Sequence, residues 1–404
     1  MMQAVLMVAG KSTRTYPLTL TRPKPLLPIA NRPLIHHSLD QMVGLFDSVI
    51  LIVGYRQEMI RKTLGESYRG IKLIYQEQKE QLGTGHAVLQ AKPHVRGSFV
   101  AMNGDDLFDR QDLQELIRFQ YAALVKRVPD PTAYGVYQID AQNRVLNLVE
   151  KPQQPLGDLA NIGCYVLQPD FFDELERTSF SERGEIEITS TILSVAKKKD
   201  FYVLPINGFW LPTGYAWDLI KHQEILMPQV ENRIDGMIEP GATLHGIVQV
   251  GNGTIIKTGS YIEGPVVIGE NCEIGPNCYL RKHTAIGHCC RIGQSVEIKN
   301  SIIMDHVNIC HLSYVGDSVI GDGCNLGAGT IIANHRHDDQ TIRSAIKGKL
   351  VDTGRKKMGA IIADGAQTGI QTSIYPGRKI WPGMTTRPGQ QVTHDLLPPD
   401  STWD

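Results

Sequence analysis

The stretch V-I-G-E-N-C-E-I-G-P-N-C-Y-L-R-K-H-T-A-I-G, residues 267–287, decides the fold of the second half of the chain. Every sixth residue in it is aliphatic: Ile268, Ile274, Leu280 and Ile286. A helix returns to one face after about 3.6 residues and a strand after two, so neither explains a period of six. A coil that turns a corner every six residues does, because its aliphatic residues then stack into one buried column. The period therefore predicts a parallel β-helix of hexapeptide repeats.

The same period extends beyond this stretch. The further aliphatic positions are Ile238, Leu244, Val250, Ile256, Ile262, Ile292 and Ile298. After a one-residue phase slip, the series resumes at Val315, Ile320, Leu326 and Ile332. It stops over residues 335–357, where we expect a loop or hairpin to leave the coil, and it returns at Ile362, Ile374 and Ile380. Thr368 occupies one step of the returning series, and the tail from Val392 is expected to be loose.

Composition narrows the class of protein. A length of 404 residues favours two or three domains, and 42% hydrophobic residues suffice for a core. With 41 basic and 42 acidic residues the net charge is −1, which indicates no bulk attraction to nucleic acid or to a membrane. The seven cysteines show no paired CxxC spacing, so we expect reduced, small buried side chains rather than a zinc site. The apolar start, residues 1–9, is too short to span a membrane, and we expect a cytoplasmic protein.

The first part of the chain has a different rhythm. Apolar runs at 4–9, 49–53, 73–75, 99–102 and 162–167 indicate buried strands, and helical patterns lie at 34–45, 59–64, 85–89 and 113–124. This alternation predicts an α/β domain with a mainly parallel sheet and helices on both faces. Ligands of such sheets bind outside the carboxyl ends of the strands. A helix over 215–227 ends before Pro228, so we place a boundary near 230, between domains 1–230 and 231–404.

The first strand is followed by a turn and two cations that suit a phosphate. Ala9 and Gly10 end the strand, and Arg14 and Lys24 follow. Backbone N–H groups of such a turn can point at a phosphate, but on its own this signal is weak.

Several motifs in a fixed order make the signal specific. The run A-G-K-S-T-R-T-Y-P-L-T-L-T-R-P-K-P-L-L-P-I-A-N-R-P-L-I, residues 9–35, resembles the signature of sugar-1-phosphate nucleotidyltransferases. Matching motifs follow at 78–85, 103–106, 149–152 and 161–163. With the β-helix behind them, nearly the whole chain resembles the bifunctional sugar-1-phosphate nucleotidyltransferase/acetyltransferase family, in its archaeal-type branch. The resemblance implies a Rossmann-like domain followed by a left-handed parallel β-helix.

The resemblance implies transfer of a uridylyl or thymidylyl group from a nucleoside triphosphate to a sugar-1-phosphate, with release of pyrophosphate. Arg14 and Lys24 would hold the phosphates, and Asp105 would bind Mg²⁺. The residues implied to bind the nucleotide are Ala9, Gly10, Gln78, Gly83 and Thr84, and those implied to face the sugar are Glu150, Lys151 and Asn161.

Three positions depart from the family pattern. Ser12 stands where a second glycine is usual, and Pro212 and Ser190 stand where acidic residues are usual. Because proline cannot bind a metal, a neighbour such as Asp106 or water would have to complete the metal shell. An enzyme whose nucleotidyltransferase site is impaired, with only acetyl transfer working, therefore remains an alternative.

A second cluster of polar residues lies where the period of six slips. Residues 311–317, 325–330 and 334 resemble the acetyltransferase half of the same family, which implies N-acetylation of a hexosamine-1-phosphate by acetyl-CoA. His311 would be the base, because an unperturbed imidazole titrates near pH 6.5. The residues implied to bind the substrates are Arg281, Lys299, Tyr314, Asn325, Ala328 and Asn334. The family's usual lysine after Asn334 is Gln340 here, with Arg343 nearby as a substitute.

Two questions stay open at this point. The basic residues of 336–357 would either meet the phosphates of CoA or merely solvate the excursion. The chain would either catalyse both reactions, giving a UDP-N-acetylhexosamine, or serve as a non-catalytic scaffold that senses nucleotide sugars. Family members form homotrimers with acetyl-transfer sites between neighbouring coils, and the resemblance implies the same here.

Overall fold

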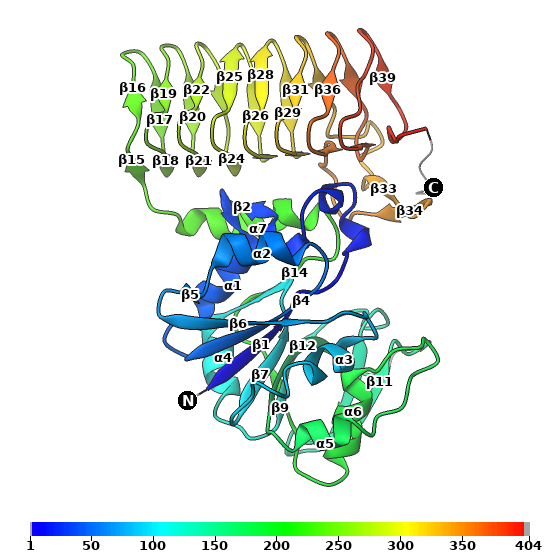
Figure 1. The fold of residues 1–404 in the computed structure, drawn as a ribbon. Helices are drawn as coiled ribbons and strands as arrows, with labels where there is room; N and C mark the ends of the chain where they lie inside the picture. The colour runs from blue at the N-terminus through cyan, green and yellow to red at the C-terminus, as the bar shows by residue number, and fades with distance from the viewer. Residues whose placement is uncertain (1, 155, 400–404) are drawn as a thin grey trace. The chain divides into compact units, whose positions relative to one another are not determined.

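A computed structural model describes residues 2–154 and 156–399, which form two compact units (Figure 1). The first unit comprises Met1–Lys11 and Leu34–Pro212, and the second comprises Ser12–Pro33 and Thr213–Asp404. The coil strands of the second unit begin at Arg233, close to the boundary expected at 230. Segments 12–33 and 213–229 nevertheless belong to the same compact unit as the coil.

A twisted ten-stranded sheet forms the first unit. Its main order is β11-β10-β12-β7-β1-β4-β6-β5, with β9 beside β12 and β13 beside β9. The neighbours β7, β1, β4 and β6 are parallel, whereas β12 runs antiparallel to β7. The strands of the unit are β1 (Gln3–Met7), β4 (Ser48–Val53), β5 (Ser67–Tyr68), β6 (Ile71–Glu77), β7 (Phe99–Asn103), β8 (Asp106–Phe108), β9 (Ala122–Arg127), β10 (Gly135–Ile139), β11 (Val145–Glu150), β12 (Leu159–Leu167), β13 (Tyr202–Pro205) and β14 (Trp210–Pro212).

Two groups of helices cover this sheet. The helices are α1 (Leu34–Met42), α2 (Gln57–Leu64), α3 (Thr84–Leu89), α4 (Arg110–Leu116), α5 (Phe171–Leu175) and α6 (Ile188–Ala196). Helices α3, α5 and α6 contact one another and share one apolar cluster with Val5, Ile50 and Phe99. The alternate residues of the same strands, such as Leu6 and Leu51, are also fully buried. Because successive strand residues point to opposite faces, both faces of the central strands are covered.

The second unit is a parallel β-helix built from three sheets, whose strands are all parallel (Figure 1). The first coil sheet contains β15 (Arg233–Ile234), β18 (Val248–Val250), β21 (Val266–Ile268), β24 (Thr284–Ile286), β27 (Ile302–Ile303), β30 (Val319–Ile320), β35 (Ile361–Ile362) and β38 (Lys379–Ile380). The second contains β16 (Met237–Ile238), β19 (Ile255–Ile256), β22 (Glu273–Ile274), β25 (Arg291–Gln294), β28 (Asn308–His311), β31 (Asn325–Leu326) and β36 (Gln367–Thr368). The third contains β17 (Thr243–His245), β20 (Tyr261–Glu263), β23 (Tyr279–Leu280), β26 (Glu297–Lys299), β29 (Tyr314–Gly316), β32 (Ile331–Ile332), β37 (Ser373–Ile374) and β39 (Gln391–Val392).

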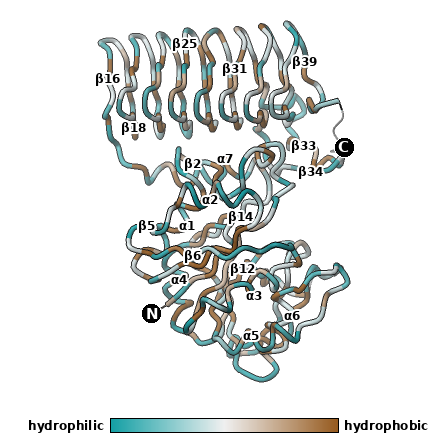
Figure 2. The backbone as a smooth tube through the Cα atoms, in the orientation of Figure 1, coloured by the Kyte–Doolittle hydropathy of each residue, from teal (hydrophilic) through white to brown (hydrophobic). Residues whose placement is uncertain are grey.

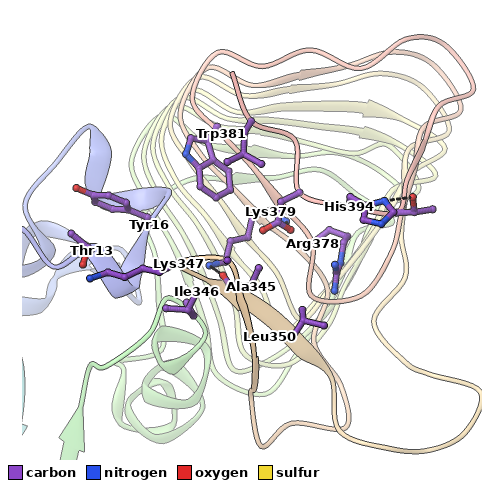
Figure 3. Close-up of a pocket in the computed structure, with 14 residues that line it drawn as sticks. Thr13, Tyr16, Ala345, Ile346, Lys347, Leu350, Arg378, Lys379, Trp381 and His394 are labelled. Carbon is purple, nitrogen blue, oxygen red and sulfur yellow. Dashed lines mark hydrogen bonds between the residues drawn. The ribbon is translucent and has the colours of Figure 1, made fainter. Parts of the chain in front are cut away.

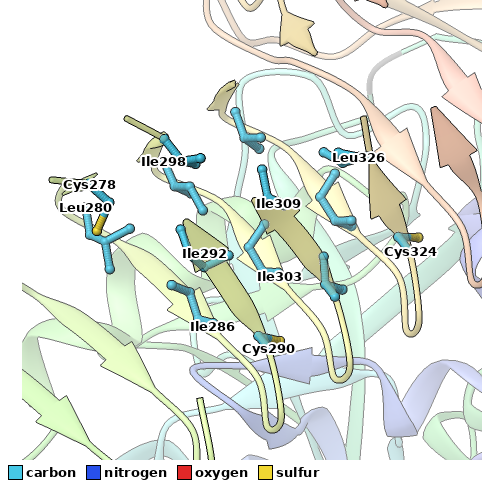
Figure 4. Packing of buried hydrophobic residues seen from close by; sticks show 14 of the residues in the cluster. Cys278, Leu280, Ile286, Cys290, Ile292, Ile298, Ile303, Ile309, Cys324 and Leu326 are labelled. Carbon is cyan, nitrogen blue, oxygen red and sulfur yellow. The ribbon is translucent and has the colours of Figure 1, made fainter. Parts of the chain in front are cut away.

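The aliphatic series lines the inside of this coil, as predicted. Ile262 is paired with Leu280, and Leu280 with Ile298, so that each residue stacks on its counterpart one turn later. Figure 4 shows the resulting column, and Figure 2 shows apolar residues recurring along successive coils. Two steps are one residue short, from Ile298 to Ile303 and from Val315 to Ile320, so the single slip read from the sequence was incomplete. Thr368 takes a ladder position and hydrogen-bonds Thr330 through their hydroxyls at 2.8 Å.

The predicted excursion between β32 and β35 is a hairpin. Strands β33 (Arg343–Ile346) and β34 (Lys349–Asp352) pair antiparallel, and the base of the excursion is closed by a bridge between His335 and Lys357. The coil then resumes in register, because Ile320 pairs with Ile362. The insertion therefore leaves the buried column intact.

A segment from the beginning of the chain is bound to the coil. It contains β2 (Pro28–Ile29), β3 (Arg32–Pro33) and short 3-10 helices, η1 (Thr13–Thr15), η2 (Leu18–Leu20) and η3 (Lys24–Leu26). The Arg22 guanidinium lies 2.7 Å from Asp322 and 2.6 Å from Asp364. Helix α7 (Asp218–Leu226), followed by η4 (Met227–Gln229), is bound as well, because the Gln223 amide donates to the carbonyl of His283 at 2.7 Å.

Three local expectations were wrong. Residues 122–124 belong to strand β9 and not to a helix. The tail from Val392 is ordered through residue 396: Gln391–Val392 forms β39, and Leu396 forms a bridge with Ile380. Five cysteines are buried, but Cys289 is exposed and Cys310 is half-buried. No helix in the described part of the chain is long and apolar enough to cross a membrane.

The buried column makes a prediction about stability. Ile256→Ala removes a fully buried ladder side chain and should lower the free energy of unfolding by about 2–5 kcal/mol. Ile234→Ala, at a coil position that is 43% exposed, is the control and should cost less than about 1 kcal/mol. Urea unfolding measures both, and equal losses would contradict the role of the column.

Candidate active sites

The first unit contains a cavity of about 240 Å³ that gathers the residues expected to face a sugar. Glu150 ends β11, Asn161 lies in β12, and both line the cavity together with Lys151. Thr84, the first residue of α3 and an expected nucleotide-binding residue, lines the same cavity. These four positions, far apart in the sequence, therefore meet at one place.

Polar contacts fix the walls of this cavity. The Asn161 amide donates to the Tyr165 hydroxyl at 2.8 Å, and its Oδ1 accepts from the Gly163 N–H at 3.2 Å. Arg183 lies 2.7 Å from Glu187 and 3.6 Å from Glu150. Burial, and next the nearby charge of Glu187, raise the pKa of Glu150. The cavity thus offers charged and amide groups of both polarities, as hydroxyl-rich ligands require.

The expected nucleotide-binding residues of the first unit are joined by hydrogen bonds and close approach. Gln81 donates to the carbonyl of Ala9 at 2.8 Å, which connects the end of β1 to the motif at 78–85. The amide of Gln78, which is 5% exposed, lies 3.0 Å from Nδ1 of His86. Gly83 has φ 104° and would place a Cβ 2.7 Å from the carbonyl oxygen of Ile186, so only glycine fits. Gly10 is exposed, and nothing lies within 4 Å of a Cβ built on it.

The expected magnesium site offers few carboxylates, so a metal bound there would take most of its ligands from phosphate oxygens of the substrate and from water. Asp105 is half-buried in the turn after β7. The neighbouring Asp106 is used inside the protein, because its Oδ2 accepts from the Trp210 indole at 3.2 Å. Pro212 pairs with Asp106 across β14 and β8 and supplies no ligand. Within the described ranges there is no group of three acidic, histidine or cysteine side chains placed to hold a metal. Mg²⁺ suits such a site, since it is often bound by one or two carboxylates plus phosphate oxygens and water.

The two expected phosphate-binding cations belong to the second unit. The Lys24 side chain is buried and its Nζ donates to the carbonyl of Thr213 at 2.7 Å. The Arg14 guanidinium is exposed and lies 5.7 Å from the centre of the Tyr215 ring. Residues 213–215 therefore hold both cations. Ser12, in place of the usual glycine, adopts a left-handed conformation with φ 52°, which costs a non-glycine residue about 1 kcal/mol.

On the coil, His311 is the last residue of β28 and is exposed. In the described part of the chain its imidazole makes no hydrogen bond or ion pair, whereas its carbonyl accepts from the Gly329 N–H at 3.2 Å and from the Ser313 hydroxyl at 2.8 Å. The backbone is thus fixed while the ring stays accessible. The hydrogen bond from Gly329 also shows that the coil turn containing Ala328 lies directly against the coil turn containing His311.

Three of the other expected acetyltransferase residues, Lys299, Tyr314 and Asn334, meet around a carboxylate that the sequence did not single out. Asp317 is 2% exposed, and its side chain accepts from the amide of Asn334 at 2.5 Å and from that of Asn300 at 2.6 Å. The Lys299 ammonium lies 3.4 Å from it. Asn334 also donates to the Tyr314 hydroxyl at 3.2 Å. Asp317 therefore links Lys299, Tyr314 and Asn334 into one network.

Two groups from outside the coil support this network. Glu224 of α7 accepts from Asn300 at 2.8 Å and from Arg355 of the excursion at 2.6 Å. Burial would raise the pKa of Glu224, but the hydrogen bonds from Arg355 and Asn300 outweigh it and lower the pKa. Arg281 is separate, because its guanidinium pairs with Glu297 at 2.9 Å. Asn325 is exposed on β31, beside β28 in the second coil sheet.

Known proteins match both halves of the chain. The family model "Nucleotidyl transferase" matches residues 3–228, and "GMPPB C-terminal domain" matches residues 262–374. The "Bifunctional protein GlmU" of Methanocaldococcus jannaschii is 41% identical over 379 residues, which cover 94% of this chain and 92% of that protein. A "Bifunctional sugar-1-phosphate nucleotidylyltransferase/acetyltransferase" of Sulfurisphaera tokodaii is 37% identical over 400 residues, 98% of each chain. The chain belongs to this bifunctional family.

Membership in the bifunctional family confirms the resemblance, the fold class and the class of enzyme predicted from the sequence. A crystal structure of UDP-glucose pyrophosphorylase complexed with UDP-glucose supports the fold of the first part, with a TM-score of 0.53 and 24% identity. It covers 57% of this chain and 100% of its own. The roles of single residues in the bifunctional enzyme stay predictions.

The Asp317 network makes a prediction about the coil site. In Asp317→Asn, one carboxylate oxygen becomes an N–H₂ group that faces a donor, so Asn334 or Asn300 must move. Acetyl transfer should fall about 100-fold, while nucleotidyl transfer stays unchanged. Asp235→Asn, which removes an exposed carboxylate at the first turn of the coil, is the control. Acetyl transfer unaffected by Asp317→Asn, in protein that unfolds at the wild-type temperature, would contradict the role of the network.

Proposed function

We propose that the enzyme acetylates a hexosamine-1-phosphate with acetyl-CoA and transfers a uridylyl or thymidylyl group from a nucleoside triphosphate to the sugar-1-phosphate, giving a nucleotide-activated N-acetylhexosamine such as UDP-N-acetylglucosamine. One observation carries the proposal: a relative whose name contains both activities aligns with the chain over 98% of its length, and a family model matches each half. The cavity of the first unit and the exposed His311 are chemically suited to the two halves of the reaction.

In nucleotidyl transfer, a phosphate oxygen of the sugar attacks the α-phosphorus and pyrophosphate leaves. The protein must mainly neutralise and orient two polyanions. Arg14 and Lys24 would stabilise the charge that develops on the α-phosphate, and Gln78, with Gly83 and Thr84, would bind the base and ribose. Glu150, Lys151 and Asn161 would hold the sugar in the cavity that they line. Mg²⁺, held by Asp105, would neutralise phosphate charge.

In acetyl transfer, the sugar amine attacks the thioester carbonyl of acetyl-CoA, and CoA leaves as the thiol. The amine must lose a proton, which the free imidazole of His311 would accept. Arg281 and Lys299 would bind the sugar phosphate, while Tyr314, Asn325 and Asn334 orient the sugar. The backbone N–H of Ala328 would polarise the thioester carbonyl in the manner of an oxyanion hole. The excursion adds Arg336 and Arg343 to the lining of a cavity of about 560 Å³, which favours contact with the phosphates of CoA.

One structural observation favours a second candidate, an enzyme that only acetylates. Pro212 occupies the position where a second acid is usual, and Asp106, its partner in the sheet, is used by Trp210. Ser190 is less telling, because it is exposed on α6 while its neighbour Thr189 lines the cavity.

Two assays separate these functions. Pyrophosphate is followed with UTP or dTTP, Mg²⁺ and N-acetylglucosamine-1-phosphate, and free thiol is followed with acetyl-CoA and glucosamine-1-phosphate. Release of both pyrophosphate and thiol would support the bifunctional enzyme. Release of thiol alone would support an enzyme that only acetylates, and release of neither would support a non-catalytic scaffold.

His311 gives the sharpest single-residue test. His311→Ala should lower thiol release at least about 100-fold, because the base is lost, and should leave pyrophosphate release unchanged. His306→Ala, a change of another histidine on a neighbouring corner of the coil, is the control. Equal loss of both activities in His311→Ala would contradict the division into two sites.

Pro212 tests the metal site. Pro212→Asp places a carboxylate opposite Asp106 in the sheet and should increase nucleotidyl transfer several-fold at limiting Mg²⁺. Pro212→Asn has a similar shape without the charge and controls for removal of the proline. If the two variants respond alike to Mg²⁺, the position is not a ligand site.

We also infer that the enzyme is a cytoplasmic homotrimer. All seven cysteines are free thiols, as is usual in a reducing compartment. The third coil sheet exposes Tyr261 and Ile331, which are 42% and 43% accessible and suit burial against another copy. Light scattering of the purified chain measures the mass, and a monomer would reject the trimer.

A further inference from the structure

The second unit contains another cavity, of about 430 Å³, next to the one assigned above to the phosphates of CoA. It lies where the end of the coil, the hairpin of the excursion and the segment after β1 meet (Figure 3). Ile346, Leu350 and the Trp381 ring form apolar walls, and Thr13 and Tyr16 close one side. Lys379 is on the first coil sheet, whereas the polar network of Asp317 lies at the third. Leu350, Arg378 and Thr393 line both cavities, whereas Lys379 and Trp381 line this one and not the cavity assigned to CoA.

A buried cation that forms no ion pair in the described part of the chain lines this cavity. Lys379 is 2% exposed, and its Nζ donates to the carbonyl of Ala345 at 2.6 Å. Among residues 2–154 and 156–399, no carboxylate forms an ion pair with it. Asp395 lines the same cavity, but its Oδ1 accepts from the backbone N–H of Lys379, and burial raises its pKa. Burial lowers the pKa of Lys379 to about 8, since a charged ammonium is costly to remove from water.

A second donor is also unsatisfied. Trp381 is 6% exposed, and its indole N–H is buried without a hydrogen-bond partner in the part of the chain that the structure describes. Figure 3 shows Lys379 and Trp381 extending from the coil toward the hairpin and Tyr16. Buried donors in native proteins nearly always have partners. A hydrogen-bond acceptor would satisfy either group, and an acceptor with negative charge would also neutralise the ammonium of Lys379.

The remaining charges select the ligand. Lys347 and Arg378 add positive charge to the lining, against the single carboxylate of Asp395. The cavity has more room than one phosphate group needs, and its apolar walls suit an organic part. We propose that this cavity is a binding site for a small phosphomonoester, whose phosphate accepts from Lys379 and Trp381. Thr13 and Tyr16 flank Arg14, so the ligand would contact the loop that carries a proposed phosphate-binding cation.

Calorimetry and thermal unfolding of the full-length protein test the proposal, with glycerol-3-phosphate and inorganic phosphate as probes. The phosphomonoester should raise the wild-type melting temperature by at least about 3 °C at saturation. Lys379→Met keeps the apolar stem and removes the charge, and it should bind at least tenfold more weakly. Trp381→Phe keeps most of the ring and removes the N–H, and it should bind several-fold more weakly. Equal affinity for both probes would identify free phosphate as the occupant.

Lys349→Met is the matched control, since Lys349 is an exposed lysine of the same hairpin that does not line the cavity. None of the variants changes a residue proposed to bind phosphate in the two reactions, so the difference between Lys379→Met and Lys349→Met reports this cavity. Lys379→Met should also unfold at a higher temperature than wild type without ligand, because a buried charge is gone. Should Lys379→Met and Trp381→Phe bind within twofold of wild type, or should wild type bind neither probe, the donors are satisfied by water and the proposal fails.

Discussion

Each turn of the coil has one apolar side chain per face that it cannot bury alone. A ladder residue such as Leu280 stacks between Ile262 on one side and Ile298 on the other. Burial of this kind is worth about 1.5–3 kcal/mol for a large aliphatic side chain, so the free energy of one turn depends on its neighbours. The inward register is thereby fixed, whereas the outward positions and the corners remain free to carry chemistry. Residues His311, Lys299 and Tyr314 all occupy such positions.

The same constraint explains what the sequence could predict. A period of six is visible in the chain itself, and so the coil, its interruption at 335–357 and the inward position of Ile362 were all accessible without a structure. The shortened steps at Ile303 and Ile320 were missed in part because isoleucines are adjacent to isoleucine or valine there, which blurs the phase. In the first unit, strands rich in valine and isoleucine were recognised, but the first three residues of β9 were read as the end of a helix because Leu113–Leu124 contains apolar residues at helical spacing.

The sites were less predictable than the fold, since their polar contacts join distant segments. Asp317 would pass for an exposed corner residue, and only Asn334 and Asn300 around it reveal its role. Glu224 reaches Arg355 across 131 positions of sequence. Lys379 precedes the inward residue Ile380, and the alternation of a strand therefore places it outside the coil. It is buried only because the hairpin and the segment after β1 cover it, which no periodicity in the sequence indicates.

The ion pairs of Arg22 have a consequence for biosynthesis. Asp322 and Asp364 are made 300 and 342 residues after Arg22. At a translation rate of about 5–20 residues per second, the segment around Arg22 emerges at least about 15 seconds before its partners exist. The amino-terminal half therefore leaves the ribosome with one of its own loops unanchored. A message truncated before codon 322 would yield a chain that lacks both partners of Arg22, and its loop would stay more available to chaperones and proteases, however well its sheet has folded.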